Sequence, residues 1–496
     1  MLTGTTPHVP RAAHAGRSSG PRAGAIVSGN PPRPGVNVTI SSTPSTRPAA
    51  LLEDLDRRHV LHPHERGHRS QRRVMVRGQG STVWDASGRE FLDALGGGIW
   101  VAQVGHGRQE LADAAARQIS ELAHFTSFFE YGTDKSALLA ERLTTLAPAG
   151  MDRVFFTCSG SEAVDTALKL ARLHHHHRGE PDRNWIIARH YGYHGTTYGS
   201  GTATGIPNMQ VAVGPNLPHV EKVMPPYPYR PEMYGGQGTT EFLLNELSET
   251  IERLGAGNIA AMIGEPVLGG GGVIAPPADY WPRVRELLRS HGILLIADEV
   301  ITGYGRIGSW FDSAPRGMDA DIITTAKGLT SGYVPMGAVL MREEIAASVA
   351  GGERDFFHGH TYSGHPVAAA VALANLDIIE KESLLARSLA ISEWFRTGLA
   401  GAAELPSVGD VRVEGAMAGI ELVADKATRE PVTDTLALAV ADELYETHGV
   451  ITRNYGPTLV LSPPLVFERA EAERTTSAIT EVLGRLDVAS GRIAPR

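Results

Sequence analysis

The sequence predicts an α/β fold with a mostly parallel central sheet, helices on both faces of that sheet, and a smaller α+β domain. Short apolar runs, such as RVFFT at 153–157 and GILLIADEV at 292–300, alternate with helical stretches through the middle of the chain. Towards the C-terminus, strand-like runs such as MAGIELV at 417–423 mix with helices instead. Short apolar runs that alternate with helices are typical of buried parallel strands joined by helical connections.

The expected elements begin with a hairpin. RGQGSTVWDASGREFLDAL at 77–95 places Asp-Ala-Ser-Gly turn chemistry between two apolar runs. Helical periodicity follows over 108–125 and over Asp134–Leu146, with Pro148 as the stop signal. Strands, or strands joined to helices, are then expected over 152–175, 184–195, 259–272, 280–300, 319–327 and 337–341, and a long helix over 366–382.

These elements divide the chain into four expected parts. They are a disordered tail over 1–48, an N-terminal segment of the small domain over 49–104, a large domain over 105–365, and a linker helix with the C-terminal small domain over 366–496. The small domain is thus built from both ends of the chain, and we expect its sheet to include the early hairpin.

The expected tail differs sharply in composition from the rest of the chain. Residues 1–48 contain five Arg, no Asp or Glu, and much Pro, Gly, Ser and Thr. Such a segment cannot bury enough apolar surface to offset the entropy of ordering it, so we expect disorder. A transit peptide shares the Arg- and Ser-rich, acid-poor composition, but the many Pro and Gly argue against the amphipathic helix that such a signal uses.

Charge and cysteine content exclude several classes of function. The net charge of −9 over 496 residues gives no electrostatic case for nucleic-acid binding. The single cysteine, Cys158, excludes an internal disulfide framework and suits a reducing compartment, so we expect a cytoplasmic protein. No apolar run reaches the roughly 18 residues that a membrane span needs.

Lysine is scarce in this chain, which makes Lys327 conspicuous. Only six of the 46 basic residues are Lys, and one of them ends the apolar strand DIITTAK. Lysine can lose its proton when desolvated, and its amine can then attack a carbonyl, which a guanidinium cannot do. The alternative is an exposed loop lysine.

Other candidate residues follow neighbouring strands of the predicted sheet. Asp298 ends GILLIAD, and CSGS at 158–161 follows RVFFT and opens a helix. Alternatives are a solvated strand end for Asp298 and a plain helix N-cap at Ser161. Open α/β sheets bind ligands beyond the carboxyl ends of their strands. A phosphate cradle, a carboxylate and an amine at that edge are the three anchors that pyridoxal phosphate (PLP) needs.

With these residues in place, the chain resembles the class III (omega-type) aminotransferases, which are PLP enzymes of fold type I. The resemblance runs from about residue 50 to 485. It is carried by ordered motifs, namely FFTCSGSEAVDTALKLAR, HYGYHGTTYG, GEPVLGGGGVIAPPADYW, LLIADEVITGYGRIGSWF, TTAKGLTSGYVPMGAVL and GHTYSGHPVAAAVALANL.

The resemblance implies roles for the residues nearest the cofactor ring. Lys327 would form the Schiff base and later carry the proton, and Asp298 would pair with the pyridinium nitrogen. Val300 would support one face of the ring, and Tyr193 would stack on the other. Glu265 would lie near the ring's phenolic oxygen or orient its neighbours.

The resemblance also implies a phosphate site that two subunits share. Gly160 and Ser161 would hold the phosphate, and Thr361 would reach it from the partner subunit. A site at a dimer interface implies at least a homodimer.

Substrate residues follow from the same resemblance. Trp100, in GGGIWVAQVG, is the candidate for a pocket wall, and Phe128 or Phe129 would add to it. Arg412, in GDVRVEG, occupies the position of a substrate-carboxylate arginine that swings away for an uncharged amine. The alternatives are a core Trp and a surface ion pair.

We therefore expect a ping-pong aminotransferase of the omega-amine:pyruvate type. It would take an amine or amino acid donor, such as alanine or glutamate, and an aldehyde, ketone or oxo-acid acceptor. An aminomutase, a decarboxylase or other lyase, and a diaminopelargonate-type transaminase share the cofactor residues and stay open, as does a non-catalytic binding or regulatory relative.

No metal is expected. HHHH at 174–177 cannot surround one ion, because adjacent residues on a helix point about 100° apart. We expect these histidines to form a solvated helix end.

Overall fold

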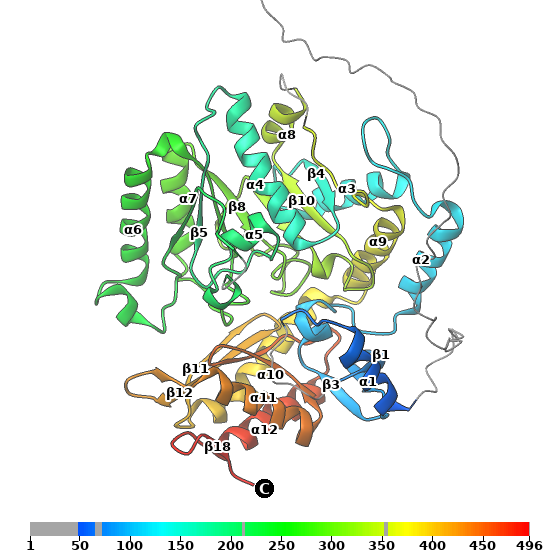
Figure 1. The fold of residues 1–496 in the computed structure, drawn as a ribbon, viewed down its shortest axis with the longest axis vertical. Coiled ribbons are helices and arrows are strands. Elements are labelled where there is room, and N and C mark those ends of the chain that lie inside the picture. Colours follow the sequence, from blue (N-terminus) through cyan, green and yellow to red (C-terminus); the bar gives the residue numbers. More distant parts are fainter. Residues whose placement is uncertain (1–47, 65–71, 211–213, 352–355, 496) are drawn as a thin grey trace, which may run out of the picture. The chain divides into compact units, whose positions relative to one another are not determined.

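The computed structural model describes residues 48–64, 72–210, 214–351 and 356–495 (Figure 1). Apart from Pro48, the expected tail over 1–48 lies outside these residues. No helix among the described ranges combines the length and the apolar character that a bilayer crossing requires.

The largest sheet has seven strands and is mostly parallel, as the sequence predicts. Strand β10 (Gly337–Met341) runs antiparallel to both of its neighbours, and every other pairing is parallel. The carboxyl ends of the other six strands therefore meet at one edge of the sheet. In spatial order around β10, the strands are β4 (Arg153–Thr157), β10, β9 (Ile322–Thr325), β8 (Leu294–Asp298), β7 (Ile259–Gly264), β5 (Trp185–Arg189) and β6 (Val220–Val223).

Both faces of this sheet are buried, because alternate side chains of each strand enter different cores. Ile186 and Ile296 pack with the helices of one face, whereas Ile187 and Leu295 pack with those of the other. The first face is covered by α4 (Gly160–His177), α5 (Tyr198–Ala203) and α8 (Glu343–Ala350). The second core includes α2 (Gln109–Leu122), α3 (Asp134–Leu146), α6 (Thr239–Leu254), α7 (Tyr280–Ser290) and α9 (Pro366–Lys381).

The two ends of the chain build the smaller sheets. The predicted hairpin forms, and Asp85 accepts backbone hydrogen bonds from Ser87 and Arg89 in its turn. Parallel pairing of β3 with β14 joins the hairpin to the C-terminal part. This sheet contains β1 (Met75–Gln79), β2 (Thr82–Asp85), β3 (Glu90–Asp93) and β14 (Val450–Ile451).

The main C-terminal sheet is separate from the hairpin, so the expectation of one shared sheet holds only for β14. It contains β11 (Val408–Glu414), β12 (Met417–Asp425), β16 (Thr458–Leu461), β15 (Arg453–Tyr455) and β13 (Glu430–Pro431). The remaining elements are α1 (Ala49–His59), α10 (Leu384–Ala403), α11 (Asp434–His448), α12 (Arg469–Gly484), β17 (Leu486–Asp487) and β18 (Arg492–Ile493). The expected domain boundaries stay a prediction.

His174 and His175 at the His-rich end of α4 are buried, so the prediction of a solvated helix end is wrong for these two residues, whereas His176 is exposed. His174 receives or donates a 2.8 Å hydrogen bond at Ser348 Oγ, and burial lowers its pKa to about 4. His175 contacts Glu180 at 2.9 Å and the carbonyl of Ala260 at 3.1 Å. No group of side chains suited to a metal ion occurs within the described parts of the chain.

Candidate active site

One pocket lies at the edge where the parallel strands end. Its lining comes from the segments that directly follow β4, β5, β7, β8 and β9. The lining residues are Ser159, Gly160, Ser161, Tyr193, His194, Gly195, Glu265, Asp298, Val300, Ile301, Ala326 and Lys327. The structure thus brings together seven predicted site residues that are far apart in sequence.

Lys327 lies two residues after β9 and faces this pocket. Its φ of 40° places the residue in the left-handed region, where a non-glycine residue is strained. Burial lowers the pKa of its ammonium group to about 8, although Asp298 and Glu265 act against that shift. Among the described residues, Nζ has no hydrogen-bond or ion-pair partner, and it lies 5.9 Å from the centroid of the Trp100 ring. This amine therefore loses its proton more easily than an exposed lysine does.

Asp298 ends β8 with a side chain that is 2% exposed, so the solvated alternative is excluded. One carboxylate oxygen contacts His194 Nδ1 at 2.7 Å, and the other accepts from the backbone N–H of Val300 at 3.1 Å. An ionised carboxylate only accepts hydrogen bonds, so Nδ1–H is the donor whenever Asp298 is charged. His194 lies in the motif HYGYHG, but the sequence predicted no role for it. The sequence feature that could have indicated a role is its position in the loop after β5.

Glu265 ties two loops of the pocket together. One oxygen accepts from the backbone N–H of Tyr193 at 2.9 Å, and the other accepts from that of Gly269, also at 2.9 Å. The side chain is buried, and burial raises its pKa. Glu265 therefore sets the distance between the Tyr193 loop and the glycine-rich loop that follows β7.

The start of α4 is open to an anion. Ser159, not Ser161, caps this helix by accepting from the N–H of Glu162 at 3.2 Å, so the alternative N-cap role for Ser161 is wrong. No acceptor for the N–H groups of Gly160 or Ser161 lies among the described residues. A Cβ at position 195 would lie 2.5 Å from Ser161 Oγ, so the approach of these loops requires glycine there. Unpaired N–H groups at a helix N-terminus form an anion site.

Trp100 lies beside the pocket at the end of an irregular turn over Gly96–Trp100, in which Gly96, Gly97 and Gly98 have positive φ. The side chain is fully buried, and its ring meets Tyr455 edge-on at 5.7 Å. A side chain on Gly269 would collide with this ring. Trp100 is therefore both a core residue and a neighbour of Lys327.

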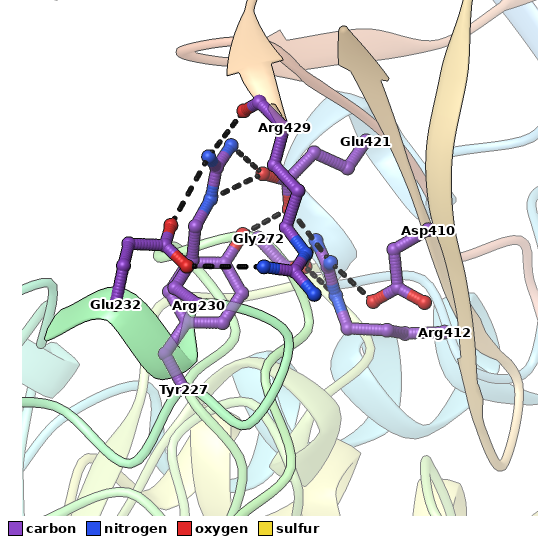
Figure 2. A network of polar contacts seen from close by, with 8 residues as sticks. All are labelled: Tyr227, Arg230, Glu232, Gly272, Asp410, Arg412, Glu421 and Arg429. Carbon is purple, nitrogen blue, oxygen red and sulfur yellow. Dashed lines mark hydrogen bonds and ion pairs between the residues drawn. The ribbon is translucent and has the colours of Figure 1, made fainter. Parts of the chain in front are cut away.

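Besides Trp100, three predicted residues lie outside the pocket lining. Phe128 is 38% exposed, and Thr361 is exposed as well. Their segments contact each other, since Ser127 Oγ donates to the carbonyl of Ser363 at 2.8 Å. Arg412 lies on β11 and hydrogen-bonds two carboxylates and the carbonyl of Gly272 (Figure 2). The partner-subunit and substrate roles of these residues stay predictions.

The residues of the pocket fit the three anchors of PLP. The chain supplies an unpartnered amine at Lys327, a buried carboxylate at Asp298 and unpaired helix N–H groups at Gly160 and Ser161. The contacts with His194 Nδ1 at 2.7 Å and with the Val300 N–H at 3.1 Å also hold the Asp298 carboxylate in one orientation, which suits an ion pair with a protonated pyridine nitrogen.

Known proteins provide an independent comparison. The family model described as aminotransferase class-III matches residues 64–483. The chain is 40% identical over 406 residues to putrescine–pyruvate aminotransferase of Pseudomonas aeruginosa, covering 81% of this chain and 88% of that protein. It is also similar to the (S)-enantioselective omega-transaminase of Thermomicrobium roseum, at 42% identity and a TM-score of 0.84, over 88% of this chain and 98% of that one. The PLP-bound amine transaminase of an uncultivated Pseudomonas species gives 40% identity and a TM-score of 0.82, over 85% and 97%.

Proposed function

Because the chain belongs to the class III aminotransferase family, we propose that it uses PLP to move an amino group from an amine or amino acid donor to an oxo acceptor. The observation that carries this proposal is the shared pocket of Lys327 and Asp298, a deprotonable amine and a buried carboxylate. When bound, PLP supplies an electron-accepting ring that stabilises negative charge on the substrate carbon.

Different residues of this chain have different roles in the proposed reaction. Lys327 offers an uncharged amine that attacks a carbonyl and later moves a proton. Asp298, oriented by His194, keeps a positive charge on a ring nitrogen stable. The N–H groups of Gly160 and Ser161 hold a phosphate, Val300 and Tyr193 enclose a flat ring, and Glu265 keeps the Tyr193 loop in place.

We further propose the omega-amine:pyruvate class, in which the donor can lack a carboxylate. Two features support it. The buried Trp100 ring, which lies 5.9 Å from Lys327 Nζ and packs closely on Gly269, gives an apolar surface beside the pocket that suits an uncharged substituent. The relatives include a putrescine–pyruvate aminotransferase and amine transaminases.

We also propose a homodimer. The segments around Phe128 and Thr361 expose large apolar side chains that a monomer leaves in water, since Phe129 is 85% and Phe357 is 84% exposed. Covering them with a second copy would bury this surface and bring Thr361 to the partner's phosphate site. Light scattering should give twice the chain mass, and a monomer would contradict the assembly. The cytoplasmic location stays a prediction.

The transfer itself is tested in two halves. An amine donor added alone to the holoenzyme should convert the cofactor to its pyridoxamine form, seen by absorbance, and pyruvate should restore the original spectrum. A panel of amines and oxo acids, with 8-amino-7-oxononanoate as one acceptor, then ranks the substrates. Release of carbon dioxide, or return of the amino group to the same molecule without an acceptor, would contradict a transaminase. No spectral change would favour the non-catalytic reading.

A further inference from the structure

The short helix α5 receives its N-terminal hydrogen bond from a neighbouring helix instead of from its own N-cap residue. Thr197 is the N-cap residue, but its side chain makes no capping bond and contacts Ser200 Oγ at 2.8 Å. The N–H of Ser200, the third residue of the helix, donates to Asp165 Oδ1 at 2.6 Å. An N-cap side chain ordinarily accepts from this position. Asp165 lies on α4, beside α5 (Figure 1), and so joins the two helices.

The carboxylate of Asp165 serves this one contact. Within the described ranges it has no ion-pair partner, and the N–H of Ser200 is its one hydrogen-bond donor. The two helices come very close here, because a Cβ at position 199 would lie 2.4 Å from Asp165 Oδ1, so the approach requires glycine there. Hydrogen bonds to a carboxylate are shorter and stronger than those to a neutral acceptor. Asp165 therefore holds the start of α5 firmly against α4.

The loop that leads into α5, residues 193–197, borders the candidate active site, and we call it the Tyr193 loop. Three of its residues line the pocket. The N–H of Thr196 in this loop donates to Ser161 Oγ at 3.2 Å. A Cβ at position 195 would lie 2.5 Å from both Ser161 Oγ and Ser200 Oγ. The loop thus lies closely on the start of α4, between the pocket and the contact of Asp165 with α5.

The contact with Thr196 restricts the direction of the Ser161 hydroxyl hydrogen. A serine hydroxyl has one hydrogen to donate and two lone pairs that accept. Because the Thr196 N–H points at the oxygen, the hydroxyl hydrogen turns away from that side. No acceptor for this hydrogen lies among the described residues, and Ser161 lines the pocket beside the unpaired N–H of Gly160. The hydroxyl can therefore donate to an anion at the start of α4.

We propose that Asp165 is a positioning residue for the phosphate of the cofactor, which holds the Thr196 N–H against Ser161 and so directs the Ser161 hydroxyl to the phosphate. The contacts run from Asp165 to Ser200, through the first turn of α5 to Thr196, and from there to Ser161. Without the contact of Asp165, the Tyr193 loop moves away from α4, and the hydroxyl loses its fixed direction. The proposal rests on the proposed function, since its ligand is PLP.

The first test uses hydrogen–deuterium exchange of the apoprotein. In Asp165→Ala, the N–H groups of Thr196 and Ser200 should exchange about 10-fold faster or more, because a hydrogen bond to a charged group is lost. Asp165→Asn keeps an acceptor oxygen and should recover most of the protection. Asp85→Ala is the matched control, since Asp85 also accepts from backbone N–H groups but lies in the hairpin turn outside the pocket lining. Unchanged exchange of the Tyr193 loop in Asp165→Ala would overturn the proposal.

The second test compares PLP with pyridoxal, which has the same ring and aldehyde but no phosphate. Titration of the apoprotein with each compound, followed by absorbance, gives two dissociation constants. Asp165→Ala should weaken PLP binding about 10-fold and pyridoxal binding less than about twofold, because the lost hydrogen bond is one to a charged group. Asp165→Asn and Asp85→Ala should bind both compounds nearly as the wild type does. Equal losses for the two compounds would overturn the proposal, and so would a lowered melting temperature with unchanged PLP binding.

A double variant tests whether Asp165 acts through Ser161. Ser161→Ala removes the hydroxyl and should itself weaken PLP binding. The double variant with Asp165→Ala should then bind PLP no more weakly than the worse single variant, because both changes act on one contact. Additive losses would overturn the proposal. A wild-type apoprotein that binds neither compound would refute the proposed function and this proposal with it, whereas normal PLP binding in Asp165→Ala would refute the proposal alone.

Discussion

Lys327 and Arg412 are both cations that the protein largely buries, yet their surroundings are opposite. Lys327 has no hydrogen-bonding partner among the described residues, and burial lowers its pKa to about 8. The Arg412 guanidinium makes hydrogen bonds to two carboxylates and a carbonyl. The carboxylates near Lys327 are instead satisfied by His194 and by backbone N–H groups.

This difference shows how hydrogen-bonding partners affect the ionisation of a buried cation. A cation without partners is destabilised by desolvation, so it loses its proton easily and becomes a nucleophile. A cation with saturated partners keeps its charge and fixes the groups around it. The following variants sharpen or break this contrast, from the largest expected effect to the smallest.

Lys327→Met should lower the rate of amino transfer by about 10⁴-fold or more, because both the nucleophile and the proton carrier are lost. The measurement is steady-state turnover with a saturating donor and acceptor. Lys222→Met is the matched control, since burial also lowers the pKa of Lys222 but this residue lies on β6 outside the pocket lining. Near-normal turnover of the Lys327 variant would refute the assignment.

Arg412→Met should destabilise the apoprotein by about 3–5 kcal/mol, because Glu421, whose side chain is 1% exposed, loses one of its cationic partners. Urea unfolding measures the change. Arg283→Met removes an exposed pair with Glu241 and should change stability far less, because solvent screens an exposed ion pair. Equal effects of the two substitutions would show that the buried contacts of Arg412 do not stabilise the fold more than an exposed ion pair does.

Lys327→Met should instead stabilise the apoprotein, by up to about 3 kcal/mol below pH 8. The folded pKa is about 8 and the ordinary value is 10.5, so the wild type regains stability as pH rises between these values. The variant has no such group, and its advantage should therefore fade by about pH 10.5. Thermal unfolding from pH 6 to 10 measures this. An advantage that is independent of pH would mean that burial of the charge is not its source.

His194→Ala should slow turnover by roughly 10–100-fold, because a hydrogen bond to a charged carboxylate is lost. His194→Asn places an amide donor near the position of Nδ1 and should recover most of the rate. The readout specific to orientation of Asp298 is the pH dependence of the cofactor absorbance, which should shift in Ala and not in Asn. His190→Ala, on the same loop but outside the pocket lining, should leave both unchanged.

Much of the fold followed from periodicity and stop signals. The helix over Asp134–Leu146 has the predicted bounds, because Thr133 caps it and Pro148 follows its end. The antiparallel direction of β10 could not be predicted from the sequence, because an apolar run has the same pattern in a parallel and in an antiparallel strand pair. The buried His174 and His175 were also missed, because their partners Ser348 and Ala260 are far away in sequence.

Site residues could be predicted from the sequence where they end a strand or directly follow one. Asp298 and Lys327 lie at or next to strand ends, so topology alone brings them together. His194 lies five residues beyond β5, where the course of a loop decides what the ring contacts. The surroundings of Arg412 depend on the β11–β12 register and on a loop 140 residues earlier. Single-sequence patterns do not encode such long-range contacts.

The close approaches of Gly269 and Gly271 limit how this enzyme can be redesigned. Added atoms at Gly269 would meet the Trp100 ring, and a Cβ on Gly271 would lie 2.8 Å from the Tyr191 carbonyl. A library that randomises this stretch should therefore yield few folded members. Trimming the indole at position 100 leaves these glycines unchanged, so on this side of the pocket it is the change that we expect to admit larger substrates.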